Sequence, residues 1–264
     1  MLHVVVIGAG PAGLVAAEAL ARAGLRTTLI ERHPHRVPPC AGLVSGRFLE
    51  EFAVPAHLGR RVGEVSVGSP SGRVAFLTLS SGDRAAYSVP RELLQALLRQ
   101  RAEAAGAKLV HARFTRFRHG DGDYPIVEIQ RPDGTREALA CDVVIGADGV
   151  HSRVARALGL PSLELGVAYT ELVSPPPAQP TVDAAQVHFG RKVSADLFGW
   201  LMPQGEALQL GVTTHARNGK RVWDMLAELK KRLGHHLDGT KALKREAFCY
   251  PLKSRDRLVH DRVL

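Results

Sequence analysis

Residues 4–13 read VVVIGAGPAG, and this stretch decides the fold of the N-terminal part of the chain. Val4–Ile7 is a continuous apolar run, which is typical of a strand buried on both faces. Gly8, Gly10 and Gly13 follow as a GxGxxG turn. In such a turn the first glycine permits the bend, the second lets a pyrophosphate approach the backbone, and the third lets a helix pack on the strand. We therefore expect phosphates to bind at the N–H groups that open this helix.

The residues after the turn complete a βαβ unit. Leu14–Ala23 has the periodicity of a helix, and Leu25–Ile30 predicts a second buried strand. Glu31 ends that strand, where its carboxylate can accept hydrogen bonds from ribose hydroxyls. An acid here disfavours a 2′-phosphate, although the neighbouring Arg32 leaves NADP open. The predicted nucleotide-binding residues of this unit are Gly8, Gly10, Pro11, Ala12, Gly13, Glu31 and Arg32.

The rest of the chain mixes strands and helices. Alternating apolar and polar residues in 62–88, broken by turn sequences that include 80–83, predict antiparallel strands. Residues 90–105 predict a helix whose buried face carries Leu93, Leu94, Leu97 and Leu98. Further strands are expected near 108–117, 125–131, 141–145, 166–170, 185–189 and through 200–214, a loop at 175–180, a helix at 222–233, and the start of a strand at 257–264.

This order predicts an α/β chain, α+β as a whole, in which a Rossmann-like FAD-binding domain is interleaved with an antiparallel-sheet substrate domain. The first domain is expected to comprise 1–60 and 85–160, with 257–264 as a candidate return to it. The second is expected to comprise 61–84 and 161–256, and it would hold the lipid substrate.

A second motif lies at residues 141–153, which read CDVVIGADGVHSR. Taken alone it is a strand, a turn and a helix start, with Ser152 as a helix cap. Paired with the glycine-rich turn, it resembles the DG motif of the p-hydroxybenzoate-hydroxylase-like flavoproteins. That resemblance places Asp148 and Gly149 near the flavin pyrophosphate. Arg91 matches an arginine of the superfamily that contacts FAD, although a solvent-exposed first-turn residue is the alternative, and Phe114 completes the expected cofactor-binding set.

Two more segments resemble the geranylgeranyl reductase branch of this superfamily. Residues 39–47, PCAGLVSGR, are similar to its Cys-Gly-Gly loop, and Ala41 stands where a glycine is usual. Residues 198–203, FGWLMP, are similar to its Tyr-x-Trp-x-Phe-Pro motif, and Met202 replaces the usual phenylalanine. The resemblance covers essentially the whole chain in the right order. It implies a lipid pocket lined by Phe198, Trp200, Met202 and Pro203, although core packing would also explain these side chains.

The resemblance implies an FAD-dependent oxidoreductase that reduces carbon–carbon double bonds in a polyprenyl lipid, quinone or pigment chain, with NADPH or ferredoxin as electron donor. Cys40, Ala41 and Gly42 would lie near the flavin ring. Cys40 is the candidate catalytic residue, for positioning or proton supply. A buried and inert cysteine is an equal alternative from the residues alone.

One departure concerns the end of the chain. The family carries a third FAD motif, a Gly-Asp after a strand resembling Arg262–Leu264, and no Gly-Asp of this chain has that context. This predicts a chain truncated before the motif. A non-catalytic protein that binds a nucleotide or a lipid is therefore one alternative function.

A second alternative is an aromatic-type FAD monooxygenase of the same superfamily, which shares the two FAD motifs but not the cysteine loop. A flavin halogenase is disfavoured, because that family needs a lysine some tens of residues after the fingerprint, and no lysine precedes Lys108.

Composition limits the remaining classes. Most of the net charge of +9 falls in residues 215–264, which suggests an anionic partner such as a membrane surface or a diphosphate. No nucleic-acid motif accompanies this charge, so nucleic acid is not expected. Cysteines are three in number and form no CxxC pair, and the 12 histidines show no metal-ligand spacing, so we expect no metal site. The predicted location is cytoplasmic, with peripheral contact at the inner membrane face.

Overall fold

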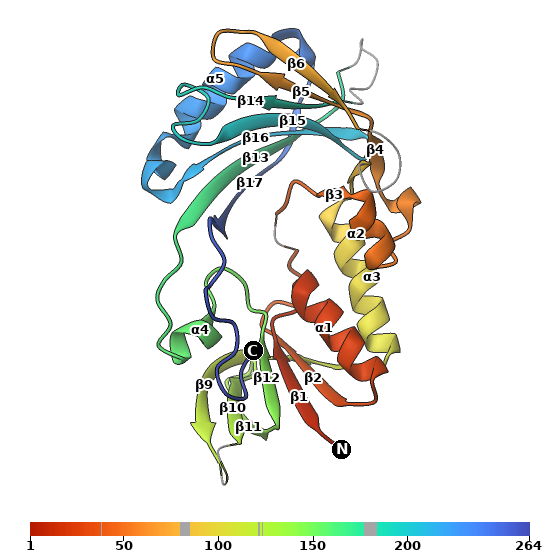
Figure 1. Cartoon of the computed structure of the whole chain (residues 1–264), viewed down its shortest axis with the longest axis vertical. Helices are drawn as coiled ribbons and strands as arrows, with labels where there is room; N and C mark the ends of the chain where they lie inside the picture. The colour runs from red at the N-terminus through yellow and green to blue at the C-terminus, as the bar shows by residue number, and fades with distance from the viewer. Residues whose placement is uncertain (38, 80–84, 121, 123, 177–183) are drawn as a thin grey trace. The chain divides into compact units, whose positions relative to one another are not determined.

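The structure is a computed structural model of the whole chain and describes residues 1–37, 39–79, 85–120, 122, 124–176 and 184–264. The chain forms two compact units (Figure 1). Unit 1 comprises Met1–Val37, Gln95–Glu164 and Lys253–Leu264, and unit 2 comprises Pro38–Leu94 and Leu165–Leu252. Residues 38–60 and 85–94, which the sequence analysis grouped with the nucleotide-binding part, thus cluster with unit 2.

Unit 1 is built on a four-stranded parallel sheet in the order β12-β1-β2-β8. Its strands are β1 (His3–Ile7), β2 (Arg26–Glu31), β8 (Lys108–His111) and β12 (Val143–Gly146). All five residues of β1 are buried, as the apolar run predicts for a central strand. The crossover from β1 to β2 is helix α1 (Pro11–Arg22), which packs on both strands. The predicted βαβ unit is confirmed.

Helix α3 (Arg91–Ala104) buries a narrower face than the sequence analysis predicted. Leu94, Leu98 and Ala102 are buried at a spacing of four residues, which is one stripe of a helix. The prediction that Leu93 belongs to this face is wrong, since 47% of Leu93 is exposed. The reason is that each residue turns the helix by about 100°, which carries Leu93 out of the stripe.

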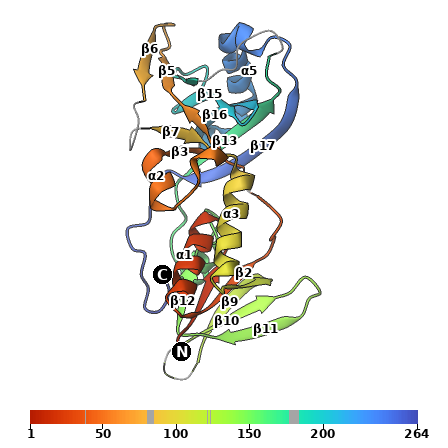
Figure 2. The ribbon, with the colours of Figure 1, turned by 90° about the vertical axis from the view of Figure 1, so that its right-hand side faces the viewer.

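Unit 1 also contains a three-stranded antiparallel sheet (Figure 2) and helix α4 (Arg153–Ala157). Its strands are β9 (Arg113–His119), β10 (Pro125–Gln130) and β11 (Arg136–Ala140). The strand expected at 257–264 does not form over that range, and Asp261 within it lies in a turn at φ 52°. Its last residues do pair with β12: the Val144 N–H donates to the Arg262 carbonyl at 2.9 Å, and the Gly146 N–H donates to the Leu264 carbonyl at 2.8 Å.

Unit 2 contains a seven-stranded sheet in the order β17-β13-β16-β15-β14-β5-β6 (Figure 1). The strands are β5 (Glu64–Gly68), β6 (Val74–Thr78), β13 (Leu165–Val173), β14 (Ala184–His188), β15 (Phe198–Gln204), β16 (Ala207–His215) and β17 (Ala242–Pro251). Neighbouring strands are antiparallel except β14 and β5, which are parallel. Strand β17 was not predicted from the sequence.

A second, three-stranded sheet in unit 2 has the order β3-β7-β4. Its first strand follows the Cys40 loop directly in the sequence. Its strands are β3 (Leu43–Ser45), β4 (Arg60–Val62) and β7 (Ala86–Ser88). The short helices of the unit are α2 (Gly46–Glu51), η1 (Ala56–Leu58), η4 (Ala216–Arg221) and η5 (Gly234–Leu237). The predicted turn at 80–83 and most of the predicted loop at 175–180 lie outside the described residues.

The two faces of the seven-stranded sheet bury different side chains. Helix α5 (Val222–Leu233) matches its predicted bounds and packs on one face through Met225, Leu229 and Leu233. The opposite face carries Trp200 and Met202. Side chains alternate between faces along each strand, so β15 contributes Leu201 to the layer under α5 and Trp200 and Met202 to the opposite layer. Within the described part of the chain, no helix is long and apolar enough to cross a membrane.

Candidate functional site

The glycine-rich turn of unit 1 has the geometry that a bound pyrophosphate requires. A Cβ on Gly13 would lie 1.8 Å from the Gly8 carbonyl oxygen, and one on Gly8 would lie 2.3 Å from the Ala147 oxygen. A Cβ on Gly10 would meet no atom within 4 Å. Two glycines therefore serve close packing, while the third faces open space at the N-cap of α1. That space lies at the positive end of the helix dipole, which favours an anion.

Glu31 ends β2 and braces the same turn. Its Oε2 accepts a hydrogen bond from the Ala9 N–H at 2.8 Å, and its Oε1 accepts one from the His33 N–H at 2.8 Å. A carboxylate has about four acceptor positions, so two remain for the hydroxyls of a ribose. The neighbouring Arg32 has an exposed side chain, and its carbonyl accepts from His111 Nε2 at 2.9 Å. Only Glu31 of this pair contacts the turn.

Asp148 of the second motif has an unpartnered atom in a buried place. Its Oδ2 accepts from the N–H groups of Arg153 at 2.6 Å and Val154 at 3.3 Å, so the carboxylate caps α4. Its Oδ1 is buried and has no hydrogen-bond partner among the described residues. Such an atom is rarely left unpaired in a native protein. Together with the open space at Gly10, it shows that these residues fit a bound dinucleotide such as FAD.

The other two predicted cofactor-binding residues of unit 1, Gly149 and Phe114, lie in different surroundings. Gly149 has φ 82° and follows Asp148 in the turn before α4, where a residue with a side chain would be strained. Phe114 is only 3% exposed and packs against Phe117 in the core of the unit, with the two rings tilted and their centroids 4.7 Å apart. Phe114 therefore packs as a core residue in this structure.

Unit 2 contains a cavity of about 220 Å³ beside the cysteine loop. Its walls come from the loop, from the start of α3 and from one face of the large sheet, and they are lined by Pro39, Cys40, Pro90, Arg91, Glu92, Thr170, Leu172, Gln204, Gln209, Lys244 and Glu246. Cys40 and Arg91, which the sequence analysis proposed separately, thus lie in one cavity. Lys244 and Glu246 come from β17 and were not predicted; Lys244 pairs with Glu246 at 2.9 Å.

The Cys40 thiol lies next to the guanidinium of Arg91, a half-buried residue. Burial lowers the pKa of the Arg91 guanidinium, and the neighbouring Cys40 thiol acts in the opposite direction. Arg91 Nε is buried and unpartnered among the described residues. Gly42 fixes the loop: it has φ 74°, and a Cβ there would lie 2.3 Å from the Val89 oxygen. The loop therefore tolerates only glycine at 42, which supports the close turn after Cys40.

Three of the predicted lipid-binding residues belong to a buried apolar cluster on one face of the sheet, which is called the apolar wall below. Phe198, Trp200 and Met202 alternate along β15 and share that face, since Trp200 and Met202 pack in one cluster with Phe198 against it. Phe248 and Tyr250 of β17 extend the same cluster. Pro203 follows Met202 in the strand, so its side chain lies on the opposite face, toward α5. Three of the four predicted residues are brought together.

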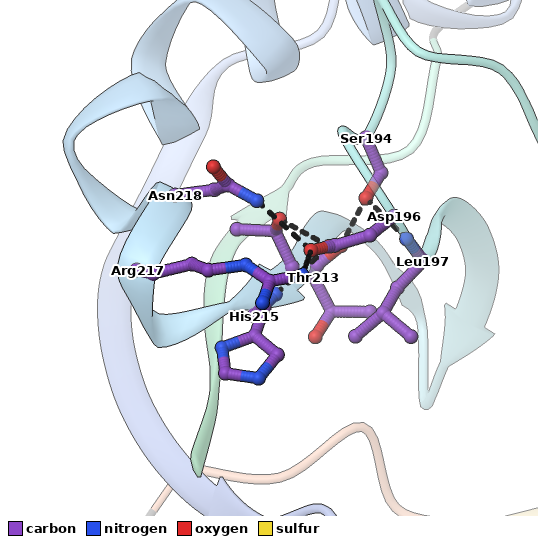
Figure 3. A network of polar contacts seen from close by, with 8 residues as sticks. Ser194, Asp196, Leu197, Thr213, His215, Arg217 and Asn218 are labelled. Atoms are coloured by element: carbon purple, nitrogen blue, oxygen red, sulfur yellow. Dashed lines mark hydrogen bonds and ion pairs between the residues drawn. The ribbon is translucent and has the colours of Figure 1, made fainter. Parts of the chain in front are cut away.

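A network of polar contacts holds the start of β15 in place (Figure 3). Ser194 is buried, donates to the Thr213 carbonyl at 2.6 Å and accepts from the Leu197 N–H at 2.9 Å. Asp196 accepts from Thr214 Oγ1 at 2.6 Å and from Asn218 Nδ2 at 2.9 Å. Burial would raise the pKa of Asp196, but these hydrogen bonds hold it below its ordinary value. The network ties the loop before Phe198 to β16 and η4.

Comparison with known proteins agrees with this geometry. The model of an FAD binding domain matches residues 1–235. Geranylgeranyl diphosphate reductase of Synechocystis is 31% identical over 274 residues, covering all of this chain and 67% of that protein. The chain belongs to the geranylgeranyl reductase family of FAD-dependent oxidoreductases.

Another relative and a solved structure show how much of each protein the similarity covers. The chloroplastic geranylgeranyl diphosphate reductase of Oryza sativa subsp. japonica is 34% identical over 279 residues, covering 99% of this chain and 59% of that protein. The crystal structure of a geranylgeranyl bacteriochlorophyll reductase-like protein from Thermoplasma acidophilum has a TM-score of 0.88 at 21% identity, covering all of this chain and 70% of that one. The solved structure shows the shared fold, and this chain spans about 60% of the length of the rice relative.

Proposed function

We propose that this chain takes part in the FAD-dependent reduction of carbon–carbon double bonds in a polyprenyl chain. The observation that carries the proposal is the apolar cluster around Trp200 and Met202, which is joined through Gln209 to a cavity that also holds the charged side chains of Arg91 and Lys244. A polyprenyl substrate has the same two parts, a long apolar tail and a polar end. Two of its relatives bear the name geranylgeranyl diphosphate reductase, which supports a substrate of this class.

The residues of the two units have separate tasks in this proposal. When bound, reduced FAD supplies the electrons of the reduction. Gly10 and Glu31 bind the pyrophosphate and ribose of the cofactor. Trp200, Met202 and Phe198 bind the alkene chain and exclude water from it. Most of the binding energy for the tail comes from burial of its methylene and methyl groups, about 0.8 kcal/mol for each.

Cys40 is our candidate for positioning the substrate or supplying a proton. Its thiol lies beside the Arg91 guanidinium and lines the cavity of unit 2. Cys141 is instead buried in the core of unit 1, where burial raises its pKa to about 12. The chemistry of the cavity therefore favours Cys40 as the functional cysteine.

The finer parts of the proposal concern partners and location. We propose NADPH or ferredoxin as the electron donor, and a cytoplasmic protein that contacts an anionic membrane at its inner face. The basic end of α5 is a candidate contact, but Lys230 is paired with buried Glu171, and Arg232 donates to the Phe189 carbonyl at 2.9 Å. Lys231 is exposed, so neutralising Lys231 is the cleaner test of vesicle binding.

The decisive experiment uses the purified chain saturated with FAD. Flavin bands that stay with the protein through gel filtration are expected, followed by anaerobic turnover of geranylgeranyl diphosphate with chemically reduced flavin. The expected product has gained two hydrogens for each reduced bond, as mass spectrometry would show. Retained flavin with no saturated product, and NADPH oxidation stimulated by phenols, would instead support a monooxygenase. A colourless protein that retains no FAD would refute the enzymatic proposal for this chain.

A further inference from the structure

Gln209 of β16 is a buried amide that joins the cysteine loop to the aromatic wall. Only 5% of the residue is exposed. Its Oε1 accepts a hydrogen bond from Trp200 Nε1 at 3.3 Å. Its Nε2 donates to the Cys40 carbonyl oxygen at 3.2 Å and to Gln204 Oε1 at 3.2 Å. The same side chain also lines the cavity that contains Cys40 and Arg91.

The partners of Gln209 fix the orientation of its amide. An indole N–H can only donate, and a backbone carbonyl can only accept. The oxygen must therefore face Trp200 and the nitrogen must face Cys40, since a flipped amide would lose both bonds. A side chain without both a donor and an acceptor would leave the indole N–H or the Cys40 carbonyl unpaired in a buried place, which is unfavourable.

The Cys40 loop, which Gln209 contacts, is also held by hydrogen bonds at Gly42. The Gly42 carbonyl accepts from the Val89 N–H at 2.9 Å, and Gly42 N–H donates to Cys40 Sγ at 3.4 Å. These contacts set the path of the backbone after the cysteine. Gln209 acts one step before them, on the carbonyl of Cys40 itself. The position of the thiol beside Arg91 thus depends on a side chain from the sheet.

We propose that Gln209 is a positioning residue, which holds the Cys40 loop in register with the Trp200 side of the apolar wall. This role rests on the proposed function, since it orients groups that we assign to polyprenyl reduction. Gln209 does not itself react. Because Gln209 ties the loop to the rigid sheet, the sheet fixes the distance between the Cys40 thiol and the bound alkene.

The test compares Gln209→Met with Gln186→Met in the full chain loaded with FAD. Gln186 is the control, because it is a half-buried glutamine of the same sheet, and its contacts with His188 and His236 lie on the α5 side. Both variants carry Cys249→Ser, and the buried Cys141 reacts slowly because its pKa is raised to about 12. Modification by a disulfide reagent then reports the accessibility of the Cys40 thiol.

We expect Gln209→Met to speed modification of Cys40 by about fivefold, which corresponds to the loss of about 1 kcal/mol from the hydrogen bond that closes the loop. The Gln186→Met rate should stay near that of the parent. In a Trp223→Phe background, the indole N–H proton of Trp200 should also move upfield in the NMR spectrum of Gln209→Met. With a polyprenyl substrate, kcat should fall more than KM rises.

Equal modification rates in the two variants, with an unmoved indole resonance, would overturn the proposal. A changed rate and resonance with unchanged kcat would also overturn it, since the loop would then move without effect on the reaction. These thiol and NMR measurements need no turnover. A chain that binds FAD but reduces no polyprenyl substrate would therefore refute the proposed function separately from the placement of the loop.

Discussion

Exchanging Gly10 and Gly13 for alanine, one at a time, separates the two tasks of the glycine-rich turn. The added methyl group at Gly10 would meet no protein atom within 4 Å, and the backbone there, at φ −72° and ψ 176°, is open to any residue. The methyl group at Gly13 would lie 1.8 Å from the Gly8 oxygen. We therefore expect Gly10→Ala to fold normally and lose FAD, and Gly13→Ala to lose stability first.

The expected sizes follow from these contacts. A carbon and an oxygen atom normally approach to no closer than about 3.3 Å, so the helix of Gly13→Ala must move by more than 1 Å. Overpacking of this kind costs about 1–3 kcal/mol, which lowers Tm by roughly 3–10 °C for a chain of this size. At Gly10 the backbone stays in place and the stability change is below about 1 kcal/mol in either direction. The methyl group then fills the space of the phosphate, and FAD affinity should fall by at least about tenfold, which is 1.4 kcal/mol.

Two measurements on each apoprotein separate the effect on stability from the effect on FAD affinity. Differential scanning calorimetry gives the Tm without cofactor, and titration with FAD followed by flavin fluorescence gives the Kd. Gly134→Ala is a control for the general effect of an added methyl group, because a Cβ there also meets no atom within 4 Å, although its φ of 89° adds strain. If Gly10→Ala bound FAD as tightly as the parent, the space at the N-cap of α1 would not be the pyrophosphate site.

Three further perturbations test the second unit. Trp200→Ala should lower the free energy of unfolding by about 3–5 kcal/mol and weaken polyprenyl binding, measured by urea unfolding and by KM; Trp200→Phe should recover most of both. Lys230→Met removes one of the cations paired with the buried carboxylate of Glu171 and should lower the free energy of unfolding by about 1–2 kcal/mol. This loss is smaller than for a fully buried ion pair, because Lys230 is 38% exposed. Adding Glu171→Gln to Lys230→Met should restore part of the lost stability in a double-mutant cycle. Burial lowers the pKa of His188 and of His236 in the folded chain, so the folded state binds fewer protons than the unfolded state. Tm should therefore fall as the pH drops below about 6.5 and stay level above it. A His188→Gln variant with the same dependence of Tm on pH as the parent would show that His188 does not cause it.

Local signals made the nucleotide-binding half of the fold predictable. The turn at residues 8–13, the acid at the end of β2 and the Ala-Asp-Gly of the second motif each depend on neighbours within a few residues. Helix α5 was predicted at its observed bounds because a buried stripe of apolar residues repeats along it. The same reasoning failed for Leu93, which adjoins the stripe of α3 but lies outside it.

Long-range pairing explains what the sequence analysis missed. Among the residues that the structure describes, strand β17 pairs with β13 alone, and its first half, Ala242–Glu246, is mostly charged and exposed. Such a strand has no clear alternation, although Phe248 and Tyr250 two residues apart were a usable signal. Gln209 could not be found at all, because its partners Cys40 and Trp200 are 169 and 9 residues away in the chain. A single buried glutamine in an apolar run indicates only that some partner exists.

In strand β15, the residues that we propose bind the lipid also pack the core of unit 2. Almost every residue of Phe198–Gln204 is buried, since one face carries the aromatic wall and the other lies under α5. The indole of Trp200 lies across Gly211 of the neighbouring strand, where a Cβ would come within 2.4 Å of the ring. On the opposite face, a Cβ on Gly199 would come within 2.7 Å of Val193 and 3.2 Å of Leu229. A side chain at Gly211 would therefore displace the Trp200 ring, whereas one at Gly199 would displace Val193 and Leu229 under the helix.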